Sequence, residues 1–128
     1  MDKQHNTLES IDLSCCTILD KDFSGISFEN AKFVNTRFER IDFSECSFAW
    51  CNMEDVRFTD CKLTHSQMAQ CRLFGSEFIG CDLDGSTFTL CGLQQAGFVH
   101  TDVGNVTMED CETDGMMWRG PAPHELTM

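Results

Sequence analysis

Nine cysteines are the residues of this sequence best equipped for chemistry, because thiols form disulfides, bind metals and attack electrophiles. Cys15 and the four histidines show no regular relation to one another. The eight other cysteines share one phase of a five-residue period: Cys16, Cys46, Cys51, Cys61, Cys71, Cys81, Cys91 and Cys111. No CxxC pair, phosphate loop or nucleophile–base set accompanies them. We therefore expect no enzyme activity, no metal and no cofactor.

The same period runs through most of the chain. Every fifth residue from Leu8 to Met108 is large and apolar, and ten of the eleven phenylalanines fall on this phase. The residue two positions before each is small or β-branched, except at Lys21. A period of five fits neither a helix nor a flat strand. It predicts a chain that turns a corner every five residues, with four sides to a coil of about 20 residues.

This pattern resembles the pentapeptide-repeat family, whose commonest unit reads A-[DN]-L-x-x, and units such as SEFIG (76–80) and CDLDG (81–85) look like those of its Cys- and Phe-rich Qnr-type branch. The resemblance implies an all-β fold, a right-handed quadrilateral β-helix with about five and a half coils. We expect residues 1–5 to form an N-terminal lead-in and residues 6–115 the β-helix. Residues 116–128 are expected to form a C-terminal cap and flexible tail.

Coils of this length stack residues that lie 20 apart, which places Cys51, Cys71, Cys91 and Cys111 in one inward column. Coils about 4.8 Å apart hold Cβ atoms farther apart than the roughly 3.8 Å of a disulfide. A linear column also does not converge four ligands on one zinc ion. The pattern thus predicts buried, reduced thiols that act as small hydrophobes. Reduced thiols favour a cytoplasmic location, and Cys15 is expected to be exposed.

The 9 basic and 21 acidic residues give a net charge of −12. Such a charge opposes direct binding to nucleic acid or to an anionic membrane and favours a protein partner with a basic surface. The N-terminus has no apolar segment typical of a secretory signal. Outward positions of one side gather the candidate acidic interaction face: Asp22, Asp42, Glu45, Asp82, Asp84 and Asp102. Solubility alone is the alternative reason for these charges.

A few outward positions are apolar. Trp50 and Leu90 fall in one column, and Phe74, Ile79 and Val99 fall near one corner. They are candidate interaction residues, with scattered surface hydrophobes as the alternative. The last coil must be covered, and Met116, Met117 and Trp118 form either a C-terminal cap or a dimer seam. The chain is accordingly expected to be a monomer or a C-terminally joined homodimer.

Two functions fit this sequence. The first is a general binding scaffold or bacterial effector module that acts through protein–protein contacts. The second follows from a resemblance to the Cys- and Phe-rich Qnr-type branch, which implies DNA mimicry and protection or regulation of a type II topoisomerase, DNA gyrase. The register is unbroken from residue 8 to residue 108, so the projecting loops of many gyrase-protecting relatives are missing.

Overall fold

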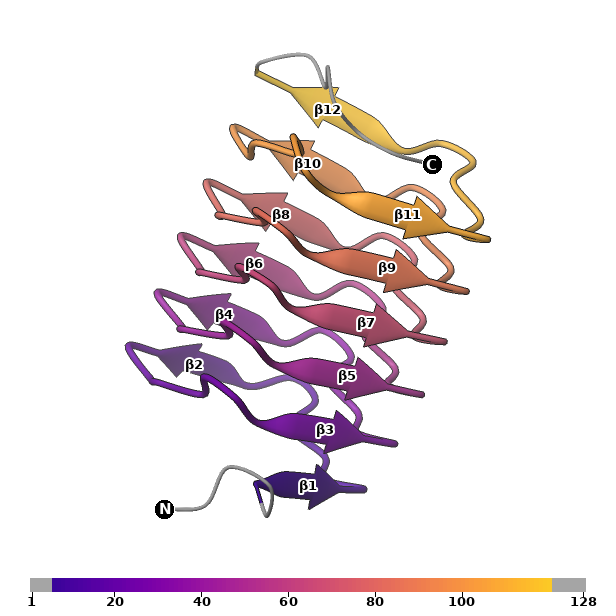
Figure 1. The fold of residues 1–128 in the computed structure, drawn as a ribbon. Helices are drawn as coiled ribbons and strands as arrows, with labels where there is room; N and C mark the ends of the chain where they lie inside the picture. The colour runs from indigo at the N-terminus through magenta and orange to yellow at the C-terminus, as the bar shows by residue number, and fades with distance from the viewer. Residues whose placement is uncertain (1–5, 121–128) are drawn as a thin grey trace.

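The computed structural model describes residues 6–120, which form twelve short parallel strands and no helix (Figure 1). No helix in this stretch is therefore long and apolar enough to cross a membrane. Face one holds β1 (Thr7–Glu9), β3 (Ser27–Glu29), β5 (Ser47–Ala49), β7 (Gln67–Ala69), β9 (Thr87–Thr89) and β11 (Thr107–Glu109). Face three holds β2 (Thr17–Leu19), β4 (Arg37–Glu39), β6 (Arg57–Thr59), β8 (Glu77–Ile79), β10 (Gly97–Val99) and β12 (Met117–Arg119).

Single-residue bridges connect the coils on the two remaining sides. Face two is the side of residues 11–15 and of the units 20, 40, 60, 80 and 100 positions later; its bridges join Asp12, Lys32, Asn52, Arg72, Gly92 and Glu112. Face four is the side of residues 21–25 and of the units 20, 40, 60 and 80 positions later; its bridges join Asp22, Asp42, Lys62, Asp82 and Asp102. Every pairing is parallel with a register of 20 residues. The predicted right-handed quadrilateral β-helix is confirmed.

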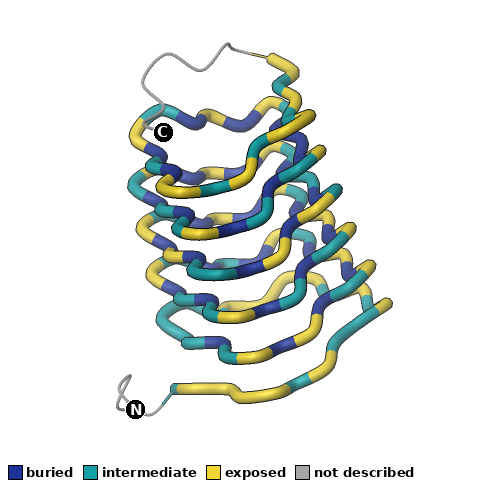
Figure 2. Tube along the Cα trace, turned by 90° about the vertical axis from the view of Figure 1, so that its right-hand side faces the viewer, coloured by how far each residue is buried: buried dark blue, intermediate teal, exposed yellow. Residues whose placement is uncertain are grey.

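The interior is filled as the five-residue period predicts. Each large residue from Phe28 to Met108 is buried, and so is each small residue from Ala31 to Val106 (Figure 2). The rings of Phe58 and Phe78 are stacked with their centroids 4.8 Å apart and their planes 4° apart. That separation equals the spacing of hydrogen-bonded strands, so ring stacking and backbone pairing have the same repeat distance.

The solenoid continues beyond the predicted boundary at residue 115. Strand β12 pairs with β10 in the ordinary register, and the Trp118 indole stacks on Phe98 with centroids 5.9 Å apart. Thr113 is the first polar residue at a large-residue position, and it is partly buried there. One polar residue at an end coil is tolerated because that coil has a neighbour on one side only. Residues 1–5 and 121–128, the predicted lead-in and the rest of the tail, lie outside the described residues.

Each side ends at a corner residue with positive φ. At several corners a glycine lies under a side chain of the preceding coil. A Cβ atom added to Gly85, where φ is +71°, would lie 2.6 Å from Cε1 of His65. The backbone conformation favours glycine here, and the close approach of the imidazole leaves no room for a Cβ atom.

Replacing Gly85 with alanine should lower the free energy of unfolding by at least about 1–2 kcal/mol, the cost of a left-handed conformation, with the His65 clash added. Urea denaturation measures the loss. In a His65→Ala background the clash is gone, so a double-mutant cycle should show a coupling of at least about 0.5 kcal/mol. Additive effects of the two substitutions would contradict the packing of His65 on Gly85.

Candidate protein-interaction surfaces

Most of the cysteine side chains lie inside the solenoid. All nine are free thiols, and six of them are buried: Cys46, Cys51, Cys61, Cys71, Cys81 and Cys91. Cys15 is exposed, as predicted. Across residues 6–120, no group of three or more histidine, cysteine, aspartate or glutamate side chains is placed to hold a metal ion.

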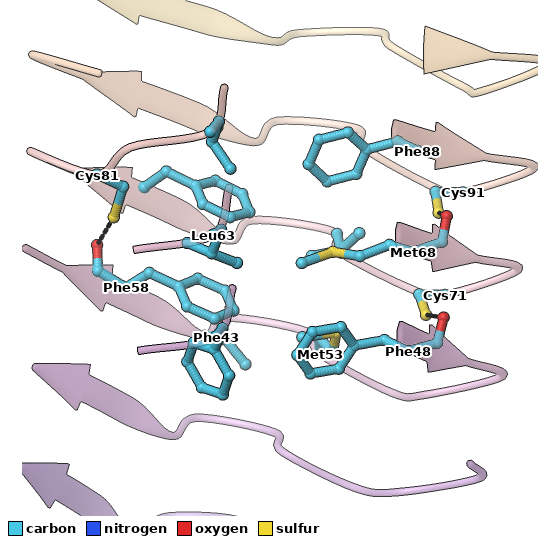
Figure 3. Packing of buried hydrophobic residues seen from close by; sticks show 14 of the residues in the cluster. Phe43, Phe48, Met53, Phe58, Leu63, Met68, Cys71, Cys81, Phe88 and Cys91 are labelled. Carbon is cyan, nitrogen blue, oxygen red and sulfur yellow. Dashed lines mark hydrogen bonds between the residues drawn. The ribbon is translucent and has the colours of Figure 1, made fainter. Parts of the chain in front are cut away.

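The thiols also donate hydrogen bonds, a role that the sequence analysis missed. Figure 3 shows Cys71 donating to the carbonyl oxygen of Phe48 and Cys81 to that of Phe58, at 3.4 and 3.3 Å. Each bond joins one coil to the coil before it. The Thr101 hydroxyl makes the equivalent bond to Phe78, at 3.0 Å. At this position the cysteines and Thr101 therefore pack as compact side chains and also donate a hydrogen bond to a buried carbonyl group, whereas the Ser66 and Ser76 hydroxyls have no hydrogen-bond partner in the described part of the chain.

Hydrogen bonds with Cys71 and Cys81 lower the pKa values of Cys51, Cys61 and Cys91, whereas burial opposes the ionisation of all the inner thiols. Burial raises the pKa of Cys46 to about 11. The pKa of Cys71 is raised further, because the Cys51 and Cys91 thiols flank it in the column and the site is buried. Protonated thiols are poor nucleophiles, so the Cys46 and Cys71 side chains are suited to packing.

Thiol labelling should separate Cys15 from the inner column. With a maleimide at neutral pH we expect Cys15 to react at nearly the rate of an unfolded thiol. Cys71 and Cys91 should react at least roughly a thousandfold more slowly, because their exposure requires unfolding. Peptide mapping of the labelled protein measures both rates. Rapid labelling of Cys71 in the folded protein would contradict its burial.

The aspartates of face four form a column and each of them also shapes a turn. Oδ1 of Asp42 accepts the backbone N–H of Ser44 at 2.9 Å, and Oδ1 of Asp102 accepts that of Gly104 at 2.8 Å. Asp22 and Asp82 bond in the same way to the second residue after them. These Asx turns explain why a short side chain with an oxygen acceptor stands at this position. From the sequence alone, these aspartates were interpreted only as surface charge.

The predicted acidic residues do lie on one side of the rod. Asp22, Asp82, Asp84 and Asp102 are exposed on face four, Asp42 is half-buried, and Glu45 is exposed at the adjoining corner. Face three differs, because two of its arginines are paired with carboxylates of a neighbouring coil. Arg40 contacts Asp20 at 2.6 Å and Arg57 contacts Glu77 at 3.0 Å. The hydrogen bond from Arg40 lowers the pKa of Asp20.

Face two carries a groove of about 550 Å³. Its apolar lining consists of Trp50, Phe74 and Leu90, whose residue surfaces are 61%, 44% and 54% exposed. The polar part of the lining comprises Glu54, Gln70, Arg72, Gln94 and Glu112, and Cys71 and Gly92 complete it.

The apolar residues predicted as interaction candidates are grouped differently in the structure. Phe74 lines it together with Trp50 and Leu90, which the sequence had placed in a separate group. Ile79 and Val99 are paired across β8 and β10 on face three, half-buried, and are not part of the groove lining. The predicted corner cluster of all three is therefore divided between two surfaces.

The sequence contained one overlooked signal for this groove. The bridge column of face two reads Asp, Lys, Asn, Arg, Gly, Glu, so that Gly92 leaves a gap between two long side chains, Arg72 and Glu112. The absence of a positive φ at Gly92 means that backbone conformation does not require glycine there. A comparison of residues 20 apart would have placed this gap beside Trp50 and Leu90.

The C-terminal candidates have three different environments. Met116 packs against the core, Trp118 stacks on the phenylalanine column, and Met117 points outward with 55% exposure. Trp118 thus covers the last ring of the column within the described residues. A dimer seam at this end stays a prediction.

The chain is similar to several solved structures of pentapeptide repeat proteins. Solved structures with this likeness include the pentapeptide repeat protein Rfr23 of the cyanobacterium Cyanothece 51142, with 12% identity, a TM-score of 0.47, and coverage of 88% of this chain and 91% of that one. A pentapeptide repeat protein of the Arabidopsis thaliana thylakoid lumen has 20% identity, a TM-score of 0.47, and coverage of 79% and 60%. QnrB1, a plasmid-mediated fluoroquinolone resistance protein, has 17% identity, a TM-score of 0.39, and coverage of 91% and 70%.

A search of curated proteins finds no sequence match. The sequence profile of the pentapeptide repeat region, in contrast, matches residues 21–98. This match covers more than half of the chain. The chain therefore belongs to the pentapeptide-repeat family.

Proposed function

We propose that the protein is a non-enzymatic interaction solenoid whose acidic face four binds a basic surface of a partner protein. The observation that carries this proposal is the column Asp22, Asp42, Asp82 and Asp102, stacked in register with Lys62 between its two halves. Like charges at this spacing repel and reduce stability. Such a cost is reasonable where the charges serve binding.

Turn geometry alone does not account for the charge. On face two, Oδ1 of the neutral residue Asn52 accepts the backbone N–H of Glu54, at 3.3 Å. An amide oxygen therefore suffices for the same turn. Four carboxylates in the equivalent column of face four add charge that the fold does not need, which supports a binding role.

The filled core supports a non-enzymatic function. Side chains from all four faces meet along the axis, so a ligand can be bound only on the outer faces. The reduced thiols suit a reducing compartment, and we place the protein in the cytoplasm on that basis.

A second candidate function is DNA mimicry toward a type II topoisomerase such as DNA gyrase, and the charge density favours it. A net charge of −12 on a rod of roughly 29 Å, about six coils at 4.8 Å each, corresponds to one charge per roughly 2.4 Å. Duplex DNA carries one charge per about 1.7 Å. A DNA-binding cleft would meet a similar electrostatic surface. A gyrase supercoiling assay, with and without a quinolone, tests this candidate.

The proposed function predicts that neutralising Asp42, Asp82 and Asp102 as asparagines weakens binding at least about tenfold and leaves the fold intact. Asparagine keeps the turn acceptor and removes the stacked charge. Wild-type and triple-variant baits should be compared by quantitative pull-down from cell extract at low and high salt. Basic partners should be depleted both by the substitutions and by salt, which screens exposed charges.

The matched control is Asp20→Asn on face three, where the carboxylate is already paired with Arg40. This control should retain the same partners as the wild type. Partners that the triple variant retains equally well, without salt dependence, would overturn the proposed function.

A further inference from the structure

We propose that the groove on face two binds an extended segment of a partner protein in which an apolar side chain is flanked by arginine or lysine. The inference deepens the proposed function, because it rests on a basic partner and adds a second, apolar contact on a different side of the rod. The groove is the one defined above, lined by Trp50, Phe74 and Leu90 and interrupted at Gly92.

The first argument is the placement of exposed apolar residues. Within residues 6–120 the exposed large hydrophobic side chains are Leu8, Leu19, Trp50, Phe74, Leu90 and Met117. Leu8, Leu19 and Met117 belong to the end coils, where the solenoid is incompletely covered. The three from the central coils all line the groove. Exposed apolar residues that gather at one concave site are typical of an interaction surface.

Two of the groove residues have a strained backbone conformation. Trp50 and Leu90 stand at corners with φ of 58° and 54°. For a bulky residue this conformation costs on the order of 1–2 kcal/mol. Burial does not offset the cost, because both side chains are mostly exposed. Large apolar residues held in a strained, exposed position indicate a function outside the folding of the chain.

The third argument is charge, which identifies the occupant. Glu54 and Glu112 contribute two carboxylates to the lining and Arg72 contributes one cation, which is 4.0 Å from Glu54. The indole face of Trp50 attracts a guanidinium or ammonium group. A second copy of this chain is a poor occupant, because two chains of charge −12 repel each other. A cationic segment with one apolar side chain complements both features.

The dimensions agree with an extended segment. Trp50 and Leu90 are separated by two coils, which corresponds to about 10 Å along the axis. Three residues of an extended chain span the same length at about 3.3 Å each. The groove therefore fits a basic–apolar–basic tripeptide that runs along the rod.

Fluorescence can test this site with a defined probe. The chain has two tryptophans, so a Trp118→Phe background, which keeps a ring on Phe98, leaves Trp50 as the only indole. The probe is acetyl-Gly-Arg-Leu-Arg-Gly-amide, titrated while Trp50 emission is recorded. We expect a saturable change in emission. The peptides with glutamate in place of arginine, or glycine in place of leucine, should bind at least tenfold more weakly.

Gly92→Lys is the blocking variant, because its side chain fills the gap and its Cβ would meet only the end of the flexible Gln94 side chain. Gly104→Lys adds the same side chain to face four and is the matched control. The blocking variant should weaken probe binding at least tenfold and the control less than twofold, with similar melting temperatures for both. Equal binding by both variants, or no saturable signal with the wild-type groove, would overturn the proposal.

Three further outcomes distinguish a failure of the groove proposal from a failure of the proposed function. Probe binding that is lost in the Asp42, Asp82 and Asp102 triple variant but retained in Gly92→Lys would assign the peptide to face four; it would refute the groove and leave the proposed function standing. Trp50 emission that changes with protein concentration alone would identify a second copy as the occupant, which also refutes the proposal. Groove binding by the probe together with salt-independent partner binding would refute the proposed function and support the groove.

Discussion

Replacement of Phe58 with alanine should lower the free energy of unfolding by about 3–5 kcal/mol, the range for a buried aromatic residue. The ring of Phe58 is fully buried. It stacks between Phe38, at 5.4 Å, and Phe78, at 4.8 Å, and meets the edge of Phe43 at 5.8 Å. The column cannot collapse to fill the gap, because the backbone bridges hold the coils at a fixed spacing. Chemical denaturation monitored by circular dichroism measures the loss.

Phe74→Ala is the matched control, since Phe74 is the one phenylalanine outside the periodic phase and is 44% exposed. It should change stability by less than about 1 kcal/mol. A solenoid is stabilised by contacts between neighbouring coils. The gap at Phe58 should therefore also uncouple the two ends, which would appear as a broader unfolding transition with a smaller m-value. Equal effects of the two substitutions would contradict the assignment of inward and outward positions.

The sequence alone predicted the interior because the coil length is fixed. Once four units of five residues make one turn, the neighbours of Phe58 along the axis follow from counting by 20. The same arithmetic gives the columns of face four, including the position of Lys62 between Asp42 and Asp82. Inward positions are determined by the period itself, since each residue type there must fit a narrow core.

Features that depend on side-chain conformation could not be counted in this way. The groove is lined both by Trp50, which ends a face-one unit, and by Phe74 on face two. The five-residue period does not specify the angle between these two faces, so the sequence alone could not place the two side chains together. The thiol hydrogen bonds likewise depend on the rotamer of each cysteine. At the C-terminal end, local composition indicated a boundary at residue 115, whereas stacking of Trp118 on Phe98 continues the coil. Tertiary contact outweighed a local polar residue there.

The folded protein should lose stability between pH 9 and pH 11, because the buried Cys46 thiol ionises in this range. Burial raises the pKa of Cys46 to about 11 from an ordinary value of 9.0. The Cys46 thiol also donates to the carbonyl oxygen of Phe23 at 2.9 Å, and a thiolate cannot make this bond. The folded state therefore holds this proton more tightly than the unfolded state does.

The direction of the effect follows from linkage. A group with a higher pKa in the folded state contributes stability that is fully present below its unfolded pKa, here near pH 9, and is lost as the pH rises through the folded value, near 11. A difference of about two pKa units corresponds to about 2–3 kcal/mol at full burial. The pKa values of Cys71 and Cys81 are raised as well, but hydrogen bonds within the columns lower those of Cys51, Cys61 and Cys91, so the expected loss is assigned to Cys46 alone.

The absence of tyrosine makes the experiment direct, because thiolate absorbance near 240 nm can be followed without tyrosinate. Urea denaturation at several pH values between 7.5 and 11 gives the free energy of unfolding of the wild type and of Cys46→Ala. The variant has no thiol at position 46 in either the folded or the unfolded state. Its free energy of unfolding should therefore decrease by about 2 kcal/mol less than that of the wild type between pH 9 and pH 11. Lysine deprotonation affects both proteins equally and cancels in the comparison. Parallel curves for the two proteins would show that Cys46 is not buried as a protonated thiol.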